Sequence, residues 1–359
     1  MQLLAKLRHN EWALALSVAV VIIAVGVGLG WENNKLVPVN PTTSSHYSLE
    51  PHNHLAFMVN WDGPIYLNLA QHGYTAKSLA NFFPLYPLLV HIVHIIIPSL
   101  VYSGLMVSWA CLAGAIYFYL KIVKRLYKTK NNLEALRAAL FFVLFPTGIF
   151  LLAAYTESLF AMLALGALYF TLQKRLAPAA VLALLATATH INGLFVVVLM
   201  ALLLLEAGVE LVKIAATAIV GSLGFVAYML YQALHFHDPL AFLSAQGSHS
   251  KLNFSLAHVA SEAATFNGLF LLLLIAAAWY WWSRRRSFSV YTLLYVLIVF
   301  VGGHGFSGQG RYALMAFPLE LMLYDYTRKK PLAYTLAIAL SSVLWAFFAL
   351  RYMGGYSGG

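Results

Sequence analysis

The sequence has few charged residues and almost no cysteine. Asp, Glu, Lys and Arg make up 9% of its 359 residues, and only 12 residues are acidic, whereas soluble globular domains carry roughly 25% charged residues. Cys111 is the single cysteine, so the chain can build neither a disulfide framework nor a thiolate metal site. Hydrophobic residues reach 62% and the mean hydropathy is +0.78. These values exclude a soluble domain and predict a polytopic membrane protein.

The net charge of +10 raises the question of a nucleic-acid partner. The Lys and Arg residues, however, stand in short clusters between apolar stretches, as orientation signals do, and do not follow one continuous face. We therefore expect membrane lipids as partners and no nucleic acid. The clusters are Lys6 with Arg8, Lys121 to Lys130, Lys174 with Arg175, Arg284 to Arg286, and Arg328 to Lys330.

The apolar stretches predict many membrane crossings. The first, Trp12–Leu29, is long enough to cross a bilayer of roughly 30 Å and has no convincing cleavage site after it, so it is expected to stay as an anchor. The others are Phe82–Ile97, Val101–Leu120, Ala135–Ala153, Ser158–Leu172, Leu176–Thr189, Leu194–Leu205, Leu211–Leu234, Phe266–Trp282, Phe288–Val301, Tyr312–Tyr326 and Leu332–Leu350.

The positive-inside rule tests how these stretches are threaded. If Phe82–Ile97, which contains two prolines and two histidines, does not cross fully, every basic cluster falls on the cytoplasmic side. If it does cross, the cluster from Lys121 falls outside and the rule fails there. We favour the first solution. It predicts an all-α polytopic membrane protein, a single transmembrane domain over residues 1–359 with roughly 11–12 transmembrane helices.

Polar residues concentrate in two segments that this topology places outside the cell. They are residues 31–81, the first extracytoplasmic loop, expected to carry short membrane-surface helices, and residues 235–265, the second. Within the first loop, Asp62 is a lone acid in the run Asn60-Trp61-Asp62-Gly63-Pro64, and the segment from Asp62 to Tyr74 has the pattern of a short helix. Asp62 is either the N-cap of that helix or a catalytic base. The two roles are compatible, because a carboxylate at a helix N-terminus stays ionised.

Two more charged residues fall on the outer side. Glu157 stands where one apolar stretch ends and the next begins, so it is either a substrate-binding residue or a first-turn acid beside the N-cap Thr156. Arg311 follows Gly308 and Gly310 and has no orientation role outside, so an anionic ligand is its natural partner, with snorkelling to lipid phosphate as the alternative.

Histidines of the first loop offer one weak metal motif. His46, His52 and His54 lie in the same loop as Glu50, but their spacing is loose. We expect solvated histidines there, no catalytic metal and no cofactor.

Several short pieces, in order, resemble the PIG-V mannosyltransferases, relatives of the second mannosyltransferase of GPI-anchor assembly with a GT-C-type fold. They are Trp61-Asp62-Gly63, Phe82-Phe83-Pro84-Leu85-Tyr86-Pro87, Phe145-Pro146-Thr147 with Tyr155-Thr156-Glu157-Ser158, Asp238-Pro239-Leu240-Ala241-Phe242, and Gly310-Arg311-Tyr312 with Phe317-Pro318. Two places depart from the family pattern. His190 stands where the family usually has Arg, and Gly247-Ser248-His249 stands where many bacterial members carry a Trp.

The resemblance implies an inverting glycosyltransferase that moves a sugar, usually mannose, from a polyprenyl-phosphate donor to a lipid-linked or glycan acceptor. Such an enzyme would act on the outer face of a bacterial membrane or the lumenal face of a eukaryotic one, and we favour a bacterial plasma membrane. Asp62 is the expected base. The candidate substrate-binding residues are Trp61, Tyr86, Glu157, His190, Gln246, His249, Lys251, Arg311 and Tyr312. The alternatives are a lipid-linked sugar flippase or transporter and a non-catalytic subunit of a transferase complex.

Overall fold

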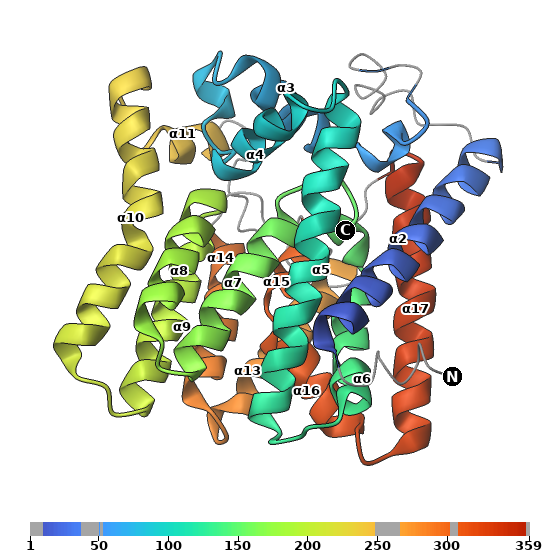
Figure 1. Ribbon diagram of the computed structural model, residues 1–359, viewed down its shortest axis with the longest axis vertical. Helices are drawn as coiled ribbons and strands as arrows, with labels where there is room; N and C mark the ends of the chain where they lie inside the picture. The colour runs from blue at the N-terminus through green and yellow to red at the C-terminus, as the bar shows by residue number, and fades with distance from the viewer. Residues whose placement is uncertain (1–9, 37–49, 51–52, 248–265, 302–307, 357–359) are drawn as a thin grey trace. The chain divides into compact units, whose positions relative to one another are not determined.

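A computed structural model describes residues 10–36, 50, 53–247, 266–301 and 308–356. Every regular element in these ranges is a helix, which confirms the all-α prediction. Four helices in them are long and apolar enough to cross a membrane, namely α2 (Glu11–Leu36), α5 (Leu100–Leu126), α10 (Leu211–Phe236) and α17 (Pro331–Met353). Shorter apolar helices accompany them (Figure 1). The described chain is therefore that of a polytopic membrane protein.

The chain divides into two compact units, which we describe separately. The first contains residues 1–73, 85–169 and 327–358, and the second contains residues 74–84 and 170–326. Besides α2, α5 and α17, the first unit holds α3 (Gly63–His72), α4 (Leu85–His94), α6 (Asn132–Val143) and most of α7 (Glu157–Leu172). Besides α10, the second unit holds α8 (Leu176–Thr189), α9 (Gly193–Glu206), α11 (Ala241–Gly247), α13 (Phe266–Trp282), α14 (Arg286–Val301), α15 (Gln309–Met315) and α16 (Pro318–Thr327).

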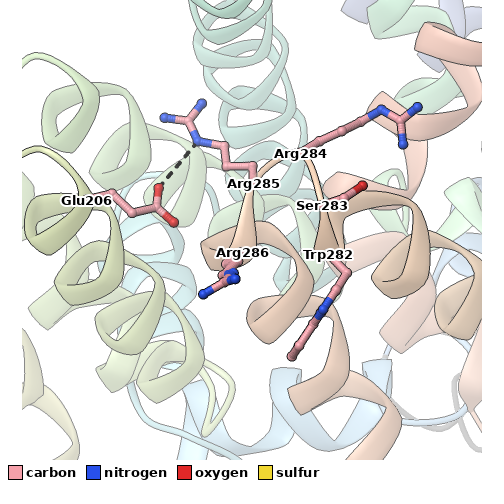
Figure 2. Close-up of a pocket in the computed structure, with 6 residues that line it drawn as sticks. All are labelled: Glu206, Trp282, Ser283, Arg284, Arg285 and Arg286. Carbon is pink, nitrogen blue, oxygen red and sulfur yellow. Dashed lines mark ion pairs between the residues drawn. The ribbon is translucent and has the colours of Figure 1, made fainter.

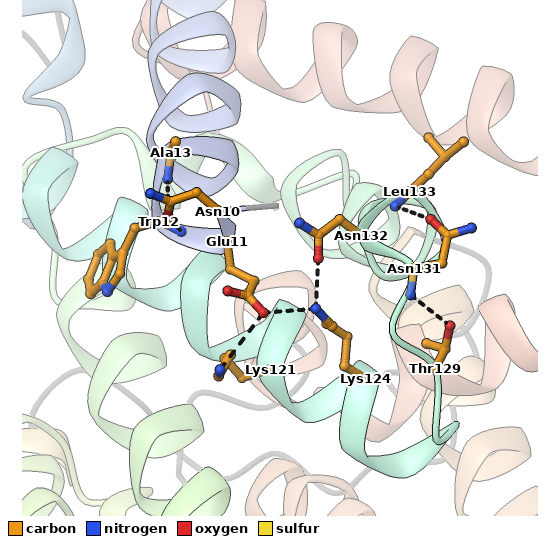
Figure 3. Close-up of polar contacts among 10 residues, drawn as sticks. All are labelled: Asn10, Glu11, Trp12, Ala13, Lys121, Lys124, Thr129, Asn131, Asn132 and Leu133. Atoms are coloured by element: carbon orange, nitrogen blue, oxygen red, sulfur yellow. Dashed lines mark hydrogen bonds and ion pairs between the residues drawn. The ribbon is translucent and has the colours of Figure 1, made fainter. Parts of the chain in front are cut away.

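At one end of the first unit, an acidic side chain and two basic side chains connect three helices. Glu11, at the start of α2, lies 2.8 Å from Lys124 and 3.8 Å from Lys121 near the end of α5 (Figure 3). The same Lys124 Nζ donates to the side chain of Asn132 at the start of α6, at 2.8 Å. The start of α2, the end of α5 and the start of α6 thus meet at one end. The positive-inside rule predicts that this end faces the cytoplasm.

Glu50 marks the opposite end of the first unit. Its Oε1 accepts hydrogen bonds from the backbone N–H of Leu100 at 2.5 Å and of Val101 at 3.3 Å, and its Oε2 accepts from Ser99 Oγ at 2.7 Å. These contacts satisfy donors at the start of α5 that no helical carbonyl can reach. The loop after α2 and the start of α5 therefore lie at the same end.

This arrangement bears on the threading of the segment Phe82–Ile97. Its helix, α4, has 10 residues and is about 15 Å long, half of the roughly 30 Å that a crossing requires. The chain leaves α2 and enters α5 at the same end of the unit, as it would if the segment did not cross the membrane fully. The favoured topology stays a prediction.

Replacing Glu50 should weaken this end of the unit. Glu50→Ala removes a charge-assisted cap from α5, and we expect the free energy of unfolding to fall by about 1–3 kcal/mol. The measurement is thermal or denaturant unfolding in detergent. Glu32→Ala is the control, because Glu32 pairs with Lys35 on the surface and both side chains are 66% exposed. Equal stability of the two variants would contradict the capping role.

Two expected single helices are broken at proline. The stretch Ala135–Ala153 forms α6, which ends at Val143 ahead of Pro146, and a short 3-10 helix, Gly148–Leu151. The stretch Tyr312–Tyr326 forms α15 and α16, which begins at Pro318. Proline has no N–H and disfavours a helical residue before it. The carbonyl freed at Met315 accepts a hydrogen bond from the Tyr291 hydroxyl, at 3.2 Å.

Candidate functional site

The loop that carries Asp62 is held in an unusual conformation. Trp61 has φ +56°, a left-handed backbone that non-glycine residues seldom adopt. Its neighbour Asn60 is fully buried and anchors the loop, because its side-chain amide donates to the carbonyls of Tyr352 at 2.8 Å and Phe57 at 3.2 Å. Such strain costs on the order of 1–3 kcal/mol and persists only where surrounding contacts enforce it. This is a feature typical of functional loops.

Two buried tyrosines enforce the conformation. The Asp62 N–H donates to the Tyr155 hydroxyl at 2.9 Å, and that hydroxyl donates to the Asn60 carbonyl at 2.9 Å, so Tyr155 bridges the backbone across Trp61. The Asn60 N–H donates to the Tyr352 hydroxyl at 3.0 Å. Both tyrosines are 0% exposed, and their rings pack edge to face at 5.9 Å. Asp62 is therefore attached to a rigid aromatic support.

Asp62 stands at the N-cap position of α3 but does not act as its cap. Its side chain makes no capping hydrogen bond, and the helix begins at Gly63 with Pro64 in its first turn. The side chain is half-buried. Of the two roles considered from the sequence, capping alone does not explain this residue.

The segment before Glu157 lies against the Asp62 loop. The Ala154 N–H donates to the Met58 carbonyl at 3.2 Å. A Cβ on Gly63 would stand 3.5 Å from the Tyr155 ring and 3.1 Å from the Val59 side chain, so the two segments are in close contact. Glu157 is 5% exposed and starts α7. Asp62 and Glu157 thus come from adjoining segments of the first unit.

Trp61 and Tyr86 occupy different environments in the same unit. Trp61 is 41% exposed beside Asp62, and its Nε1 donates to the Tyr356 carbonyl at 3.3 Å. Tyr86 is fully buried, and its hydroxyl donates to the Gly104 carbonyl at 3.0 Å. This contact joins α4 to α5. It gives the buried Tyr86 hydroxyl a structural partner, so its presence does not require a role in substrate binding.

In the second unit, the positive charge of Arg311 affects the pKa of His190. Burial and, to a smaller extent, the positive charge of Arg311 lower the pKa of His190 to about 4. His190 follows the last residue of α8, and its Nδ1 accepts a hydrogen bond from the Asn192 N–H at 3.2 Å. It is therefore neutral at pH 7. His190 does not supply the positive charge that the family arginine would carry at this place.

Arg311 stands in the first turn of α15, after a glycine turn. Gly308 has φ +81°, and the Arg311 N–H donates to the Gly308 carbonyl at 3.0 Å. The side chains of Arg311 and Tyr312 are both partly exposed. Because Arg311 belongs to the second unit, the expectation that it shares a cleft with Asp62 stays a prediction.

Some candidates lie outside the described residues. They are His249 and Lys251, the side chain of Gln246, and the loop histidines His46 and His52. Among the residues that the structure describes, no group of three metal-binding side chains comes together. Glu50, which shares the loop with the histidines, is instead occupied as the cap of α5.

The sequence reasoning assigned no role to the residues that fix the Asp62 loop. Tyr155 belongs to the motif Tyr155-Thr156-Glu157-Ser158, but nothing in the sequence indicated that its hydroxyl would reach the backbone of Asp62. Tyr352 is 292 residues away from Asn60, and no local pattern connects them. A buried carboxyl, Glu320, was also missed. It is 0% exposed, and neither side-chain oxygen has a hydrogen-bond partner within the described part of the chain.

Removing the Tyr155 hydroxyl should separate positioning from binding. Tyr155→Phe keeps the packed ring but loses both hydrogen bonds to the loop. We expect the turnover of the reaction proposed below to fall roughly 10–100-fold with little change in KM, because the reacting carboxylate moves. The free energy of unfolding should fall by only about 1–2 kcal/mol. Tyr102→Phe is the control, since Tyr102 is 40% exposed. A variant of normal turnover would show that Tyr155 does not position Asp62.

Comparison with known proteins points to one family. Residues 38–207 match the family model described as mannosyltransferase (PIG-V). The chain is also 33% identical over 119 residues to GPI mannosyltransferase 2 of Drosophila pseudoobscura pseudoobscura, a match that covers 30% of this chain and 25% of that protein. The chain thus spans about a quarter of the length of this relative in the match. The match confirms the resemblance to the PIG-V mannosyltransferases over residues 38–207, a range that contains Asp62, Tyr155 and Glu157. The similar pieces that begin at Asp238 and Gly310 lie outside it.

Proposed function

We propose that this chain, whose residues 38–207 carry a mannosyltransferase (PIG-V) domain, transfers mannose from a polyprenyl-phosphate donor to a lipid-linked or glycan acceptor outside the cytoplasm. The observation that carries the proposal is the rigidly held backbone of Asp62. Asp62 lies at the end of the first unit opposite Lys121 and Lys124, which pair with Glu11. A half-buried carboxylate with a fixed backbone is suited to act as a general base.

The chemistry needs one base. An acceptor hydroxyl oxygen bonds to C1 of the mannose while the bond between C1 and the phosphate oxygen breaks. The hydroxyl proton passes to the Asp62 carboxylate, and the electron pair of the broken bond leaves with the polyprenyl phosphate. Because phosphate leaves readily, no second, acidic carboxyl is required. Direct displacement inverts the configuration at C1.

Arg311 is the candidate for the phosphate end of the donor. A guanidinium can hold two phosphate oxygens at once, and its charge strengthens the interaction as negative charge develops on the leaving phosphate. The neutral state of His190 leaves Arg311 as the cation of that pair. Trp61 is partly exposed next to Asp62, where its ring can pack against the apolar face of a sugar.

One observation favours a second candidate, a lipid-linked sugar transporter. Glu320 is a fully buried carboxyl that follows the break between α15 and α16. Broken helices with buried charges are typical of transporter sites. Asp62 does not fit this function, because it lies in a loop at the end of its unit.

The test is a donor comparison. Purified protein in liposomes receives labelled polyprenyl-phosphate mannose or labelled GDP-mannose, together with a membrane extract as acceptor source. We expect label in a new product only with the lipid-linked donor, and none with heat-inactivated protein. Movement of the donor across the bilayer without a product would favour the transporter, and use of GDP-mannose would contradict the proposed donor.

A further inference from the structure

The second unit contains an arginine-lined cavity at the end where α9, α13 and α14 meet. It has a volume of about 660 Å³ and is lined by Glu206, Trp282, Ser283, Arg284, Arg285 and Arg286 (Figure 2). Lys174 Nζ, from the turn between α7 and α8, donates to the Ala207 carbonyl at 2.9 Å, so the basic turns of this unit lie at the same end. By the positive-inside rule this end faces the cytoplasm, away from the side on which the proposed reaction takes place.

Among the described residues that line the cavity, the one carboxylate, Glu206, is already occupied. Glu206 accepts hydrogen bonds from the Ser287 N–H at 2.9 Å and from the Ser287 Oγ at 3.1 Å, which satisfies the start of α14. Its Oε2 also lies 3.8 Å from Arg285 Nε. One carboxylate therefore serves both a helix terminus and one of three arginines.

The other two arginines have no acidic partner within the part of the chain that the structure describes. Arg284 lies over the Tyr280 ring at 4.0 Å and donates one hydrogen bond to the Tyr280 carbonyl at 3.0 Å, which leaves most of its N–H donors available. Arg286 is exposed at the cavity. The described lining thus carries two positive charges in excess of its carboxylate, which favours an anionic group such as a phosphate.

An apolar surface leads to this cavity along α13. Leu269, Leu272, Ile275, Trp279 and Trp282 are all exposed and recur every three or four residues, so they share one face of the helix. Trp279 is 82% exposed. A tryptophan at the end of such a face is typical of the boundary between bilayer core and headgroups. The face fits an acyl chain, and it ends at the arginines.

We propose that this cavity binds the phosphate of an anionic phospholipid of the cytoplasmic leaflet, with an acyl chain along the exposed face of α13. Arg284 and Arg286 point to opposite sides of the turn (Figure 2) and would have to turn toward the phosphate oxygens on binding, with Ser283 as a hydroxyl donor. A free phosphate would use the same arginines but would gain nothing from the apolar face. If these arginines only oriented the chain in the membrane, they would need neither a cavity nor neighbouring tryptophans.

The test measures binding of phosphatidylglycerol to the full-length protein in phosphatidylcholine nanodiscs. We expect saturable binding that weakens at least tenfold in the double variant Arg284→Gln/Arg286→Gln. The matched control is Lys128→Gln/Lys130→Gln, which removes the same charge from another basic turn and should leave binding unchanged. Thermal unfolding of each protein shows that it is folded, and Trp282→Leu supplies a second variant, expected to weaken lipid binding without a change of charge.

Three results would overturn the proposal. They are binding that does not saturate, equal loss in the two double variants, and displacement of the lipid by inorganic phosphate at a matched concentration, which would mark a site for soluble phosphate. The proposal does not depend on the reaction at Asp62. Failure of the lipid experiment leaves the mannosyltransferase proposal intact, and the reverse also holds.

Discussion

Asp62→Asn should reduce mannose transfer roughly 10²–10⁴-fold, the usual cost of losing a general base. The substitution keeps the size of the side chain and removes only its capacity to take a proton. The backbone contacts that hold the loop, from Asp62 N–H to Tyr155 and from Asn60 to Tyr352, do not involve the carboxylate. Folding should therefore be unaffected, and the loss should appear in kcat.

The control for Asp62→Asn is Glu210→Gln. Glu210 pairs with Lys213 at 2.9 Å on an exposed surface, where an ion pair contributes little to stability. The measurement is the initial rate of labelled mannose transfer at saturating donor for the wild type and both variants. Near-normal turnover in Asp62→Asn would show that the carboxylate is not the base.

Arg311→Ala should weaken use of the donor by an amount on the order of 2–4 kcal/mol, if its contact strengthens as charge develops on the phosphate. Arg311→Lys should fall between the wild type and Arg311→Ala, because an ammonium keeps the charge but loses the two-pronged geometry. The transfer rate is measured against donor concentration for all three proteins.

A matched arginine tests whether loss of charge alone explains the Arg311 result. Arg175 lies over the Phe170 ring at 5.0 Å in a turn of the same unit, so Arg175→Ala removes one charge without touching the proposed donor site. Wild-type donor kinetics are expected. Wild-type kinetics in Arg311→Ala would instead place the phosphate elsewhere, with Lys251 and His249 as the next candidates.

The sequence predicted the helical class and the position of Asp62 because both depend on local signals. Hydropathy sums over a window, and the basic clusters lie next to the helices that they orient. The helix from Gly63 to His72 also follows from a local pattern, a proline in the first turn after a polar residue. These signals do not require knowledge of which helices pack together.

The support of the site depends on contacts between distant residues and could not be predicted in this way. The left-handed conformation of Trp61 is imposed by Tyr155 and Tyr352, which are 93 and 292 residues from the atoms they bind in the loop. The prolines that break the helices, Pro146 and Pro318, are visible in the sequence. Hydropathy is averaged over a window, however, so each pair of helices separated by a proline was predicted as one apolar stretch. The lowered pKa of His190 depends on burial, which its neighbours in sequence do not reveal.

The claim that Asp62 is the base, and not a residue that merely maintains the loop, is tested most directly by donor binding and single-turnover transfer measured on the same sample of Asp62→Asn. If the carboxylate takes the acceptor proton, the variant binds polyprenyl-phosphate mannose with the affinity of the wild type and forms product at least roughly 100-fold more slowly. Product formation at the wild-type rate, or loss of donor binding that by itself accounts for the missing activity, would contradict the account.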